Sequence, residues 1–375
     1  MAGNEIHVLA VGDVDVNRDD PDSIFAHVAD TIRSADIAFC QLESNYYSEK
    51  AIVLPQARVP SVAHPRNAPA IKKAGFNVVS YAGNHALDCG SEAFLNTIEI
   101  LRRTGIDPIG VGRNIEEARR PQIIDCKGTK IAFLAYCSIL PMGYWADVSR
   151  PGCAPMRAWT VYEQIEHDQP GTPARIHTFA NEYDKAAMIS DIQKAKAQAD
   201  IVMLSVHWGI HFKEAEISMY QREYAYAALE AGVDVILGHH AHILKAIEIY
   251  KGKPIFYSLC NFALDLELPK ELLNSPRWQE LMELNPSWTL DPRYKSYPFP
   301  ADSRMTLAAK ITILDKKVKR VTFLPALINE NSQPRFLSKR DKEFNDVIAY
   351  MQKVSKAQNI DTKYTAEGNE VTILP

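Results

Sequence analysis

The chain has 375 residues, of which 46% are hydrophobic and 23% are charged, a composition typical of a globular enzyme. Its 42 basic and 46 acidic side chains give a net charge of −4, so it lacks the basic field that nucleic-acid binding exploits, and we expect no nucleic-acid partner. The N-terminus shows no signal-peptide pattern, the most apolar run (131–140) has only the length of a strand, and the six cysteines form no CxxC pair. These features predict a cytoplasmic protein with no membrane partner.

Apolar runs of strand length alternate with stretches of helical pattern along the chain. Strands are predicted at 5–13, 35–43, 77–85, 130–138, 200–209 and 233–242, and helices near 22–34, 66–75, 88–103, 182–198 and 218–231. Hairpins at 243–260 and 311–324 add antiparallel pairs. Strand–helix–strand alternation favours parallel sheets, and two sheets with helices outside fit the pattern better than one doubly wound sheet.

Two segments interrupt this alternation. Residues 141–181 are rich in Pro, Trp, Tyr and Arg, and residues 266–304 are rich in Pro and Trp. We interpret both as insertions over a functional site, because binding loops on rigid sheets commonly have this character. The first insertion shows no helical or strand periodicity, which predicts a specificity lid. The domain organisation that follows is a catalytic domain over 1–336 and a C-terminal helix and tail over 337–375.

Polar side chains with metal-binding chemistry follow the predicted strands at the point where each strand ends. They are Asp13, Glu43, Asn84, His207, His240 and His242. Each alone has an ordinary explanation, such as a turn carboxylate or a core histidine. Together they favour a metal site, because a core has no use for so many polar strand ends and open α/β folds bind ligands at this edge. Their oxygen and nitrogen donors suit Mn, Fe, Zn, Mg or Ca.

The motifs in chain order also carry a family resemblance. They are GD at 12–13, QLE at 41–43, GNHALDCG at 83–90, VHWG at 206–209, GHHAH at 238–242 and GKPIFYSLCNF at 252–262. This series resembles the CapA, or poly-γ-glutamate-synthesis-protein, family of the calcineurin-like metallophosphoesterase superfamily, over about residues 5–265 and weakly again over 305–336. The resemblance implies a four-layer α/β/β/α sandwich, metallo-dependent phosphatase-like, with a dinuclear site at the strand ends.

The resemblance further implies how the ligands divide between two divalent ions, which we expect to be Mn, Fe or Zn. One ion would take Asp13, Glu43 and His242, and the second would take Glu43, Asn84, His207 and His240, with Glu43 as the bridge. His85, beside a ligand, would then be the proton donor or electrostatic stabiliser. Asp88, three residues on, is placed to hold the tautomer of that imidazole.

The chain departs from the family pattern in three ways. Asp15 stands where many phosphoesterases of the superfamily have a histidine, and it would either serve as an oxygen ligand or be solvated. Cys260 stands where the family usually has glycine. From the sequence we also expect no membrane anchor of the kind typical of capsule-assembly members, and this expectation argues against a role in the capsule.

Three catalytic functions stay open from the sequence. We expect a metal-dependent hydrolase that activates a metal-bound water against an amide, ester or lactone bond of a small carboxylate or peptide-like substrate. A phosphoesterase, or an epimerase or lyase using the His85–Asp88 pair, would use the same residues, whereas a non-catalytic capsule-assembly role is disfavoured. Tyr144, Trp145 and Arg150 of the first insertion are predicted to contact the substrate, because an arginine fork favours a carboxylate or phosphate.

Overall fold

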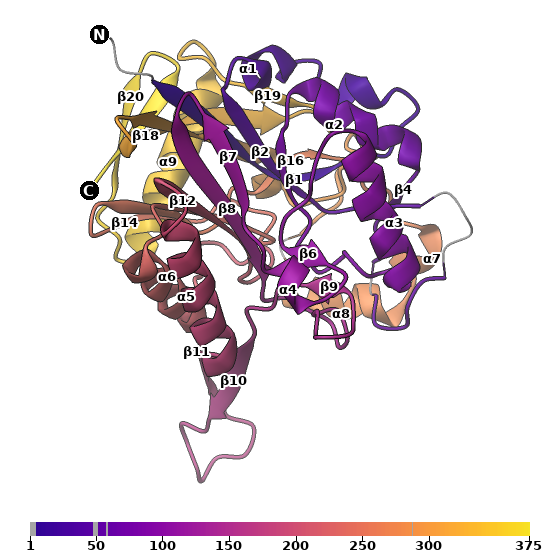
Figure 1. Ribbon diagram of the computed structural model, residues 1–375. Helices are drawn as coiled ribbons and strands as arrows, with labels where there is room; N and C mark the ends of the chain where they lie inside the picture. Colours follow the sequence, from indigo (N-terminus) through magenta and orange to yellow (C-terminus); the bar gives the residue numbers. More distant parts are fainter. Residues whose placement is uncertain (1–4, 48–51, 58, 287) are drawn as a thin grey trace.

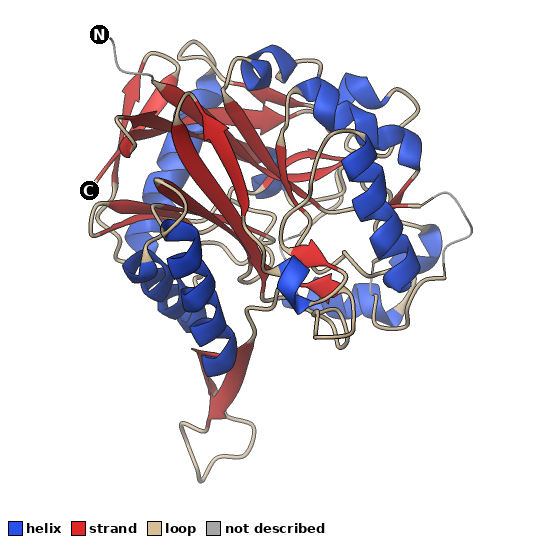
Figure 2. Cartoon of the chain, in the orientation of Figure 1, coloured by secondary structure: helices blue, strands red, loops and turns tan. Residues whose placement is uncertain are grey.

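The computed structural model, which describes residues 5–47, 52–57, 59–286 and 288–375, is organised around two β-sheets (Figures 1 and 2). The first sheet has nine strands: seven run in the order β20-β21-β18-β17-β1-β2-β5, while β16 pairs with β1 and β19 pairs with β18. The bounds are β1 Ile6–Asp15, β2 Ile37–Leu42, β5 Val78–Ser80, β16 Asn261–Leu264, β17 Met305–Leu314, β18 Lys317–Ile328, β19 Pro334–Phe336, β20 Lys363–Glu367 and β21 Glu370–Leu374.

The second sheet has six strands in the order β14-β15-β13-β12-β8-β7. The bounds are β7 Gln122–Cys126, β8 Thr129–Cys137, β12 Ile201–His207, β13 Val235–His239, β14 Ile247–Tyr250 and β15 Lys253–Phe256. β8, β12, β13 and β15 are mutually parallel, as the strand–helix alternation predicted. Every residue of β12 is buried, which explains its nearly continuous apolar sequence.

The two sheets pack face to face around a shared core. The rings of Phe39 on β2 and Phe133 on β8 are stacked with their centroids 6.3 Å apart. The ring of His239, at the end of β13, lies 5.7 Å from that of Phe39. The carboxyl ends of strands from both sheets therefore meet at one side of the sandwich, where the polar motifs lie.

Helices cover the outer faces of the two sheets (Figure 1), so the expected four-layer α/β/β/α arrangement is confirmed. The bounds are α1 Ala29–Arg33, α2 Ala68–Ala74, α3 Gly90–Arg103, α4 Ile115–Ala118, α5 Glu182–Lys196 and α6 Met219–Ala231. α6 begins at a capping box in which Ser218 and Gln221 satisfy each other's backbone amides. The helix expected near 22–34 is shorter, because a 3-10 turn at Pro21–Phe25 precedes α1.

The C-terminal segment packs against both sheets and adds strands to the first. α9 (Lys342–Ala357) contacts β18 and β20 of the first sheet and β14 of the second. Where a tail was expected beyond this helix, β20 and β21 form a hairpin, and β21 pairs with β18 through Thr372 opposite Thr322. Residues 337–375 thus extend the first sheet, because the apolar side chains of Val371 and Ile373 are buried there.

The first insertion contains regular strands, so the expectation that it lacks strand periodicity is wrong, whereas its role as a specificity lid stays a prediction. β9 (Gly152–Cys153) pairs with β6 (Val111–Gly112), and β10 (Ala158–Glu163) pairs with β11 (Arg175–Ala180). The β10–β11 hairpin projects from the body of the molecule below α5 and α6 (Figure 1). Cross-strand pairing of Trp159 with Phe179 supports it, as aromatic pairs do in hairpins.

The remaining short elements lie near the polar strand ends. β3 (Asn45–Tyr46) pairs with β4 (Val62–Ala63), and a 3-10 turn, Pro65–Asn67, precedes α2. The second insertion folds into α7 (Lys270–Leu273), α8 (Pro276–Leu284) and a 3-10 turn at Ala301–Arg304. Among the described residues, no helix combines the length and the apolar character needed to cross a bilayer.

Candidate active site

Asp13 is fixed where β1 meets β16. Its backbone N–H donates to the carbonyl oxygen of Cys260 at 3.0 Å. A Cβ atom on the preceding residue, Gly12, would lie 1.9 Å from the same oxygen, so only glycine permits this approach. Cys260 itself adopts a left-handed backbone with φ of 66°, which is the conformation that the glycine usual in the family would favour.

Three potential metal-ligand atoms, from three separate segments, converge beside Asp13 and Glu43. The Asn84 Oδ1 atom lies 2.7 Å from His207 Nε2 and 3.0 Å from His240 Nδ1, and the two histidine nitrogens are 3.2 Å apart. Burial lowers the pKa of both histidines well below the usual value, so their rings are neutral. Neutral imidazole nitrogens and an amide oxygen at this spacing are the donors that a divalent metal takes.

Buried carboxylates supply the negative charge of the same site. Asp13, Glu43 and His207 offer ligand atoms that all lie within 4.8 Å of one another and could hold a metal ion. Burial and the neighbouring Asp13 raise the pKa of Glu43 well above its usual value. The ion pairs of Asp13 and Glu43 are all with histidines, and Asp13 Oδ1 and Glu43 Oε1 have no hydrogen-bond partner among the described residues. Such oxygens are costly to bury unless a cation is bound, so the residues fit a metal centre.

His242 is held by a neighbouring amide. Its Nδ1 atom lies 2.6 Å from Asn261 Oδ1 and 3.6 Å from Asp13 Oδ2. Since the Asn261 Nδ2 group donates to the hydroxyl of Tyr297 at 2.7 Å, the Oδ1 atom accepts from His242, whose Nε2 lone pair is left for a ligand. His240 and His242 both have positive φ angles, 86° and 54°, a strain that is concentrated at functional sites.

His85 and Asp88 form the pair that their spacing predicted. His85 Nδ1 lies 2.7 Å from Asp88 Oδ2, and His85 Nε2 lies 3.9 Å from Glu43 Oε2. The Asp88 carboxylate also accepts from the Tyr144 hydroxyl at 3.2 Å and from the Ser61 backbone N–H at 3.2 Å. Burial lowers the pKa of His85, but the Asp88 and Glu43 carboxylates outweigh it and raise that pKa to about 9.

Asp15 is buried, so the alternative in which it is solvated is wrong. The Ser61 hydroxyl donates to its Oδ2 atom, while Oδ1 has no partner among the described residues. Burial raises the pKa of Asp15 to about 6 despite that hydrogen bond. Its role as a metal ligand stays a prediction.

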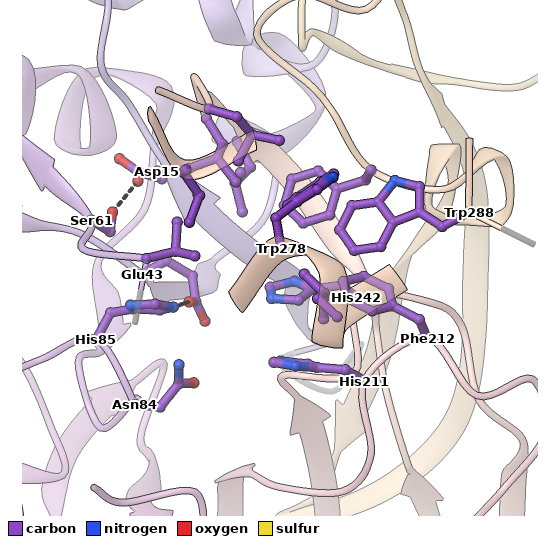
Figure 3. A pocket seen from close by; sticks show the side chains of 17 residues that line it. Asp15, Glu43, Ser61, Asn84, His85, His211, Phe212, His242, Trp278 and Trp288 are labelled. Carbon is purple, nitrogen blue, oxygen red and sulfur yellow. Dashed lines mark hydrogen bonds and ion pairs between the residues drawn. The ribbon is translucent and has the colours of Figure 1, made fainter. Parts of the chain in front are cut away.

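A cavity of about 200 Å³ opens beside these residues. Its polar lining consists of Asp15, Glu43, Ser61, Asn84, His85, His211 and His242. Figure 3 shows Trp278, Trp288 and Phe212 across the cavity from Glu43 and His85. Both tryptophans belong to the second insertion, so this segment forms part of the cavity wall.

Three residues of the first insertion were predicted to contact the substrate, and of these three Tyr144 alone reaches the site. Tyr144 is buried and touches Asp88. Trp145 lines a separate hollow bordered by α4 and α5, where its ring stacks under the guanidinium groups of Arg150 and Arg157. Arg150 pairs with Asp147 at 3.2 Å. The structure places Trp145 and Arg150 apart from the cavity beside His85, and their contact with the substrate stays a prediction.

Two site residues escaped the sequence reasoning. The His211 ring lies with its centroid 3.8 Å from that of His240, and His211 Nε2 is 3.2 Å from His240 Nδ1. Asn261 orients His242, as described above. The available signals were the position of His211 four residues after His207 and the place of Asn261 in the CNF motif that opens β16.

Comparison with known proteins identifies the family of the chain. Residues 7–266 match the model of the bacterial capsule synthesis protein family PGA_cap. The chain is 27% identical over 252 residues to capsule biosynthesis protein CapA of Bacillus anthracis, covering 67% of this chain and 56% of that one. It is 28% identical over 245 residues to PGA biosynthesis protein CapA of Bacillus subtilis, covering 65% and 57%. The chain thus spans little more than half the length of these relatives.

More distant likenesses extend the comparison. A probable polyglutamine synthesis accessory protein of Mycobacterium tuberculosis is 28% identical over 208 residues, covering 54% of this chain and 49% of that one. Among solved structures, the calcineurin-like phosphoesterase YfkN from Bacillus subtilis aligns with a TM-score of 0.40 and 13% identity, covering 94% of this chain and 97% of that one.

Proposed function

The chain belongs to the PGA_cap family of bacterial capsule synthesis proteins, and from this premise we propose that it is a metal-dependent hydrolase. The observation that carries the proposal is the convergence of Asn84, His207 and His240 within 2.7–3.2 Å of one another, beside the buried carboxylates of Asp13 and Glu43. Two divalent ions, Mn, Fe or Zn, would be held by Asp13, Glu43 and His242 and by Glu43, Asn84, His207 and His240. Bound ions of this kind lower the pKa of water and polarise the bond under attack.

His85 is the residue that we assign to proton transfer. Its Nδ1–H is committed to Asp88, so the Nε2 atom is the one available to a substrate in the cavity that His85 lines. The Tyr144 hydroxyl and the Ser61 amide hold Asp88 in place, which fixes the ring orientation of His85. A histidine held in this way can give a proton to a departing group as the bond breaks.

An amide or ester is the bond class that the surroundings of the site support best. In the described part of the chain, no lysine or arginine lines the cavity to hold the charge of a phosphate ester. The Mycobacterium tuberculosis relative is named for polyglutamine synthesis, and a glutamine polymer is joined by amide bonds. Hydrolysis of phosphate esters is the competing outcome of the same test.

Metal analysis and a substrate screen test the proposal together. Protein purified from metal-supplemented cells should carry roughly two equivalents of divalent metal, and removing them with a chelator should abolish hydrolysis of small esters and amides. His207→Ala should lose bound metal, whereas the matched variant His27→Ala, on an exposed histidine outside the site, should keep it. Full activity of the metal-free protein would overturn the proposal, and turnover of phosphate esters alone would reassign the bond class.

A further inference from the structure

The cavity beside the candidate metal centre has Glu43 and His85 on one side and an apolar wall across from them, with His211 and His242 next to Phe212 of that wall (Figure 3). The apolar wall is defined by side chains on the second insertion and the loop after β12: Phe212, Leu266, Leu268, Leu272, Trp278, Leu281, Trp288 and Phe299. It faces Glu43 and His85, which the proposed mechanism places at the reacting bond. A substrate that fills the cavity would therefore place an apolar group across from these two residues.

The aromatic side chains of this wall pack against one another. The ring centroids of Phe212 and Trp288 are 4.7 Å apart, and those of Trp278 and Trp288 are 5.4 Å apart with the rings edge to face. The Trp288 Nε1–H donates to the carbonyl oxygen of Pro298 at 3.1 Å, so its polar edge is satisfied within the insertion. The wall therefore offers ring surface to a ligand, as apolar binding pockets do.

Among the side chains that the structure describes, the apolar wall holds none that could neutralise an anionic group of a substrate. The arginines of the first insertion are paired elsewhere: Arg150 with Asp147, Arg157 with Asp184 and Arg175 with Glu163. Among the described side chains, the charged groups that line the cavity are the carboxylates Asp15 and Glu43 and the His85 imidazole paired with Asp88, and none of them belongs to the apolar wall. A second carboxylate or a phosphate placed against the wall would be desolvated without a partner, which is costly.

We propose that the apolar wall binds a phenyl-sized apolar group of the substrate, carried on the acyl side of the bond that is cleaved. This inference rests on the proposed hydrolase function for the position of that bond. The volume is sufficient, since a cavity of roughly 150 Å³ holds benzene and this one measures about 200 Å³. Trp278 and Leu281 of α8 are then specificity residues that select the acyl group.

Binding to the metal-free protein tests the wall apart from catalysis. Phenylacetamide and acetamide, titrated calorimetrically into chelator-treated protein, should differ in affinity by about tenfold or more, because burial of apolar area scales with the ring. Trp278→Ala and Leu281→Glu should each remove most of this difference. Trp159→Ala, which alters an exposed tryptophan of the projecting hairpin, should leave it unchanged. Thermal melts verify that each variant is folded.

Kinetics of the metal-loaded protein complete the test. p-Nitrophenyl phenylacetate should be hydrolysed with a kcat/KM about tenfold or more above that of p-nitrophenyl acetate, a preference that Trp278→Ala abolishes. Equal binding of the two amides and equal kcat/KM for the two esters would overturn the inference while the hydrolase proposal stands. Selective binding of phenylacetamide without turnover of either ester would support the inference that the wall binds an apolar group. The same result would contradict the proposed hydrolase function.

Discussion

The two insertions have similar compositions but differ in how much of each borders the site. The first borders it through its opening residues, since Pro141 and Met142 line a hollow with His85 and Tyr144 contacts Asp88. The second, 266–304, follows β16, which pairs with Asp13–Asp15 of β1, and it folds back as α7 and α8 to wall the cavity. The first, 141–181, pairs its β9 with β6 and packs its β11 against α6, so most of it leads away from the site. Richness in Trp, Tyr and Pro thus marks an insertion, and the backbone pairing of the segment determines what it covers.

Substitutions of residues at the candidate active site should have the largest effect on catalysis. His85→Ala should lower kcat on the order of 10²–10⁴-fold, the usual loss when a general acid or base is removed. Metal content measured by elemental analysis should stay close to wild type, because His85 pairs with Asp88 and is not in the proposed ligand set. An empty metal site in His85→Ala would show that the role of His85 has been assigned wrongly.

The contact of the first insertion with the site should matter chiefly for stability. Tyr144 is fully buried, so Tyr144→Ala should lower the free energy of unfolding by about 3–5 kcal/mol, as large-to-small aromatic changes do. Tyr144→Phe keeps the packing and loses only the hydrogen bond to Asp88, so we expect a cost of about 1 kcal/mol. Urea denaturation of the three proteins measures both values, and equal costs for the two variants would contradict the packing role.

Matched tryptophan variants compare the two insertions directly. Trp288→Ala, in the cavity wall, should change kcat/KM for a substrate with an apolar acyl group by about tenfold. Trp145→Ala should change it by no more than about twofold, because Trp145 stacks on Arg150 and Arg157 in a separate hollow. Steady-state kinetics on both variants suffice. A larger kinetic effect at Trp145 would restore the first insertion as the specificity element.

The tip of the projecting hairpin should be dispensable. Residues 164–174 connect β10 and β11 and are exposed, so replacing them with an Asn-Gly turn preserves the hairpin and should leave kcat/KM within about twofold and the melting temperature within a few degrees. Differential scanning fluorimetry and ester kinetics check this smallest effect. Loss of activity on shortening the tip would mean that the hairpin reaches the substrate after all.

The sequence by itself determined the layers and most of the polar site. Buried strands such as β1 and β12 read as apolar runs that end in Asp13 and His207, and helical patterns fell between them. The three-residue spacing of His85 and Asp88 predicted their contact because it acts within one turn of chain. Local patterns of this kind depend on neighbours in the sequence, so they can be recognised without knowledge of the fold.

The tertiary structure alone decided which distant side chains meet. His211 reaches His240, and Asn261 reaches His242, through turns with positive φ angles that no periodicity announces. Asp15 had two readings until the fold buried it beside Ser61. The direction of each insertion depended on the strand or helix against which it packs. That contact joins residues far apart in the sequence, so composition does not encode it.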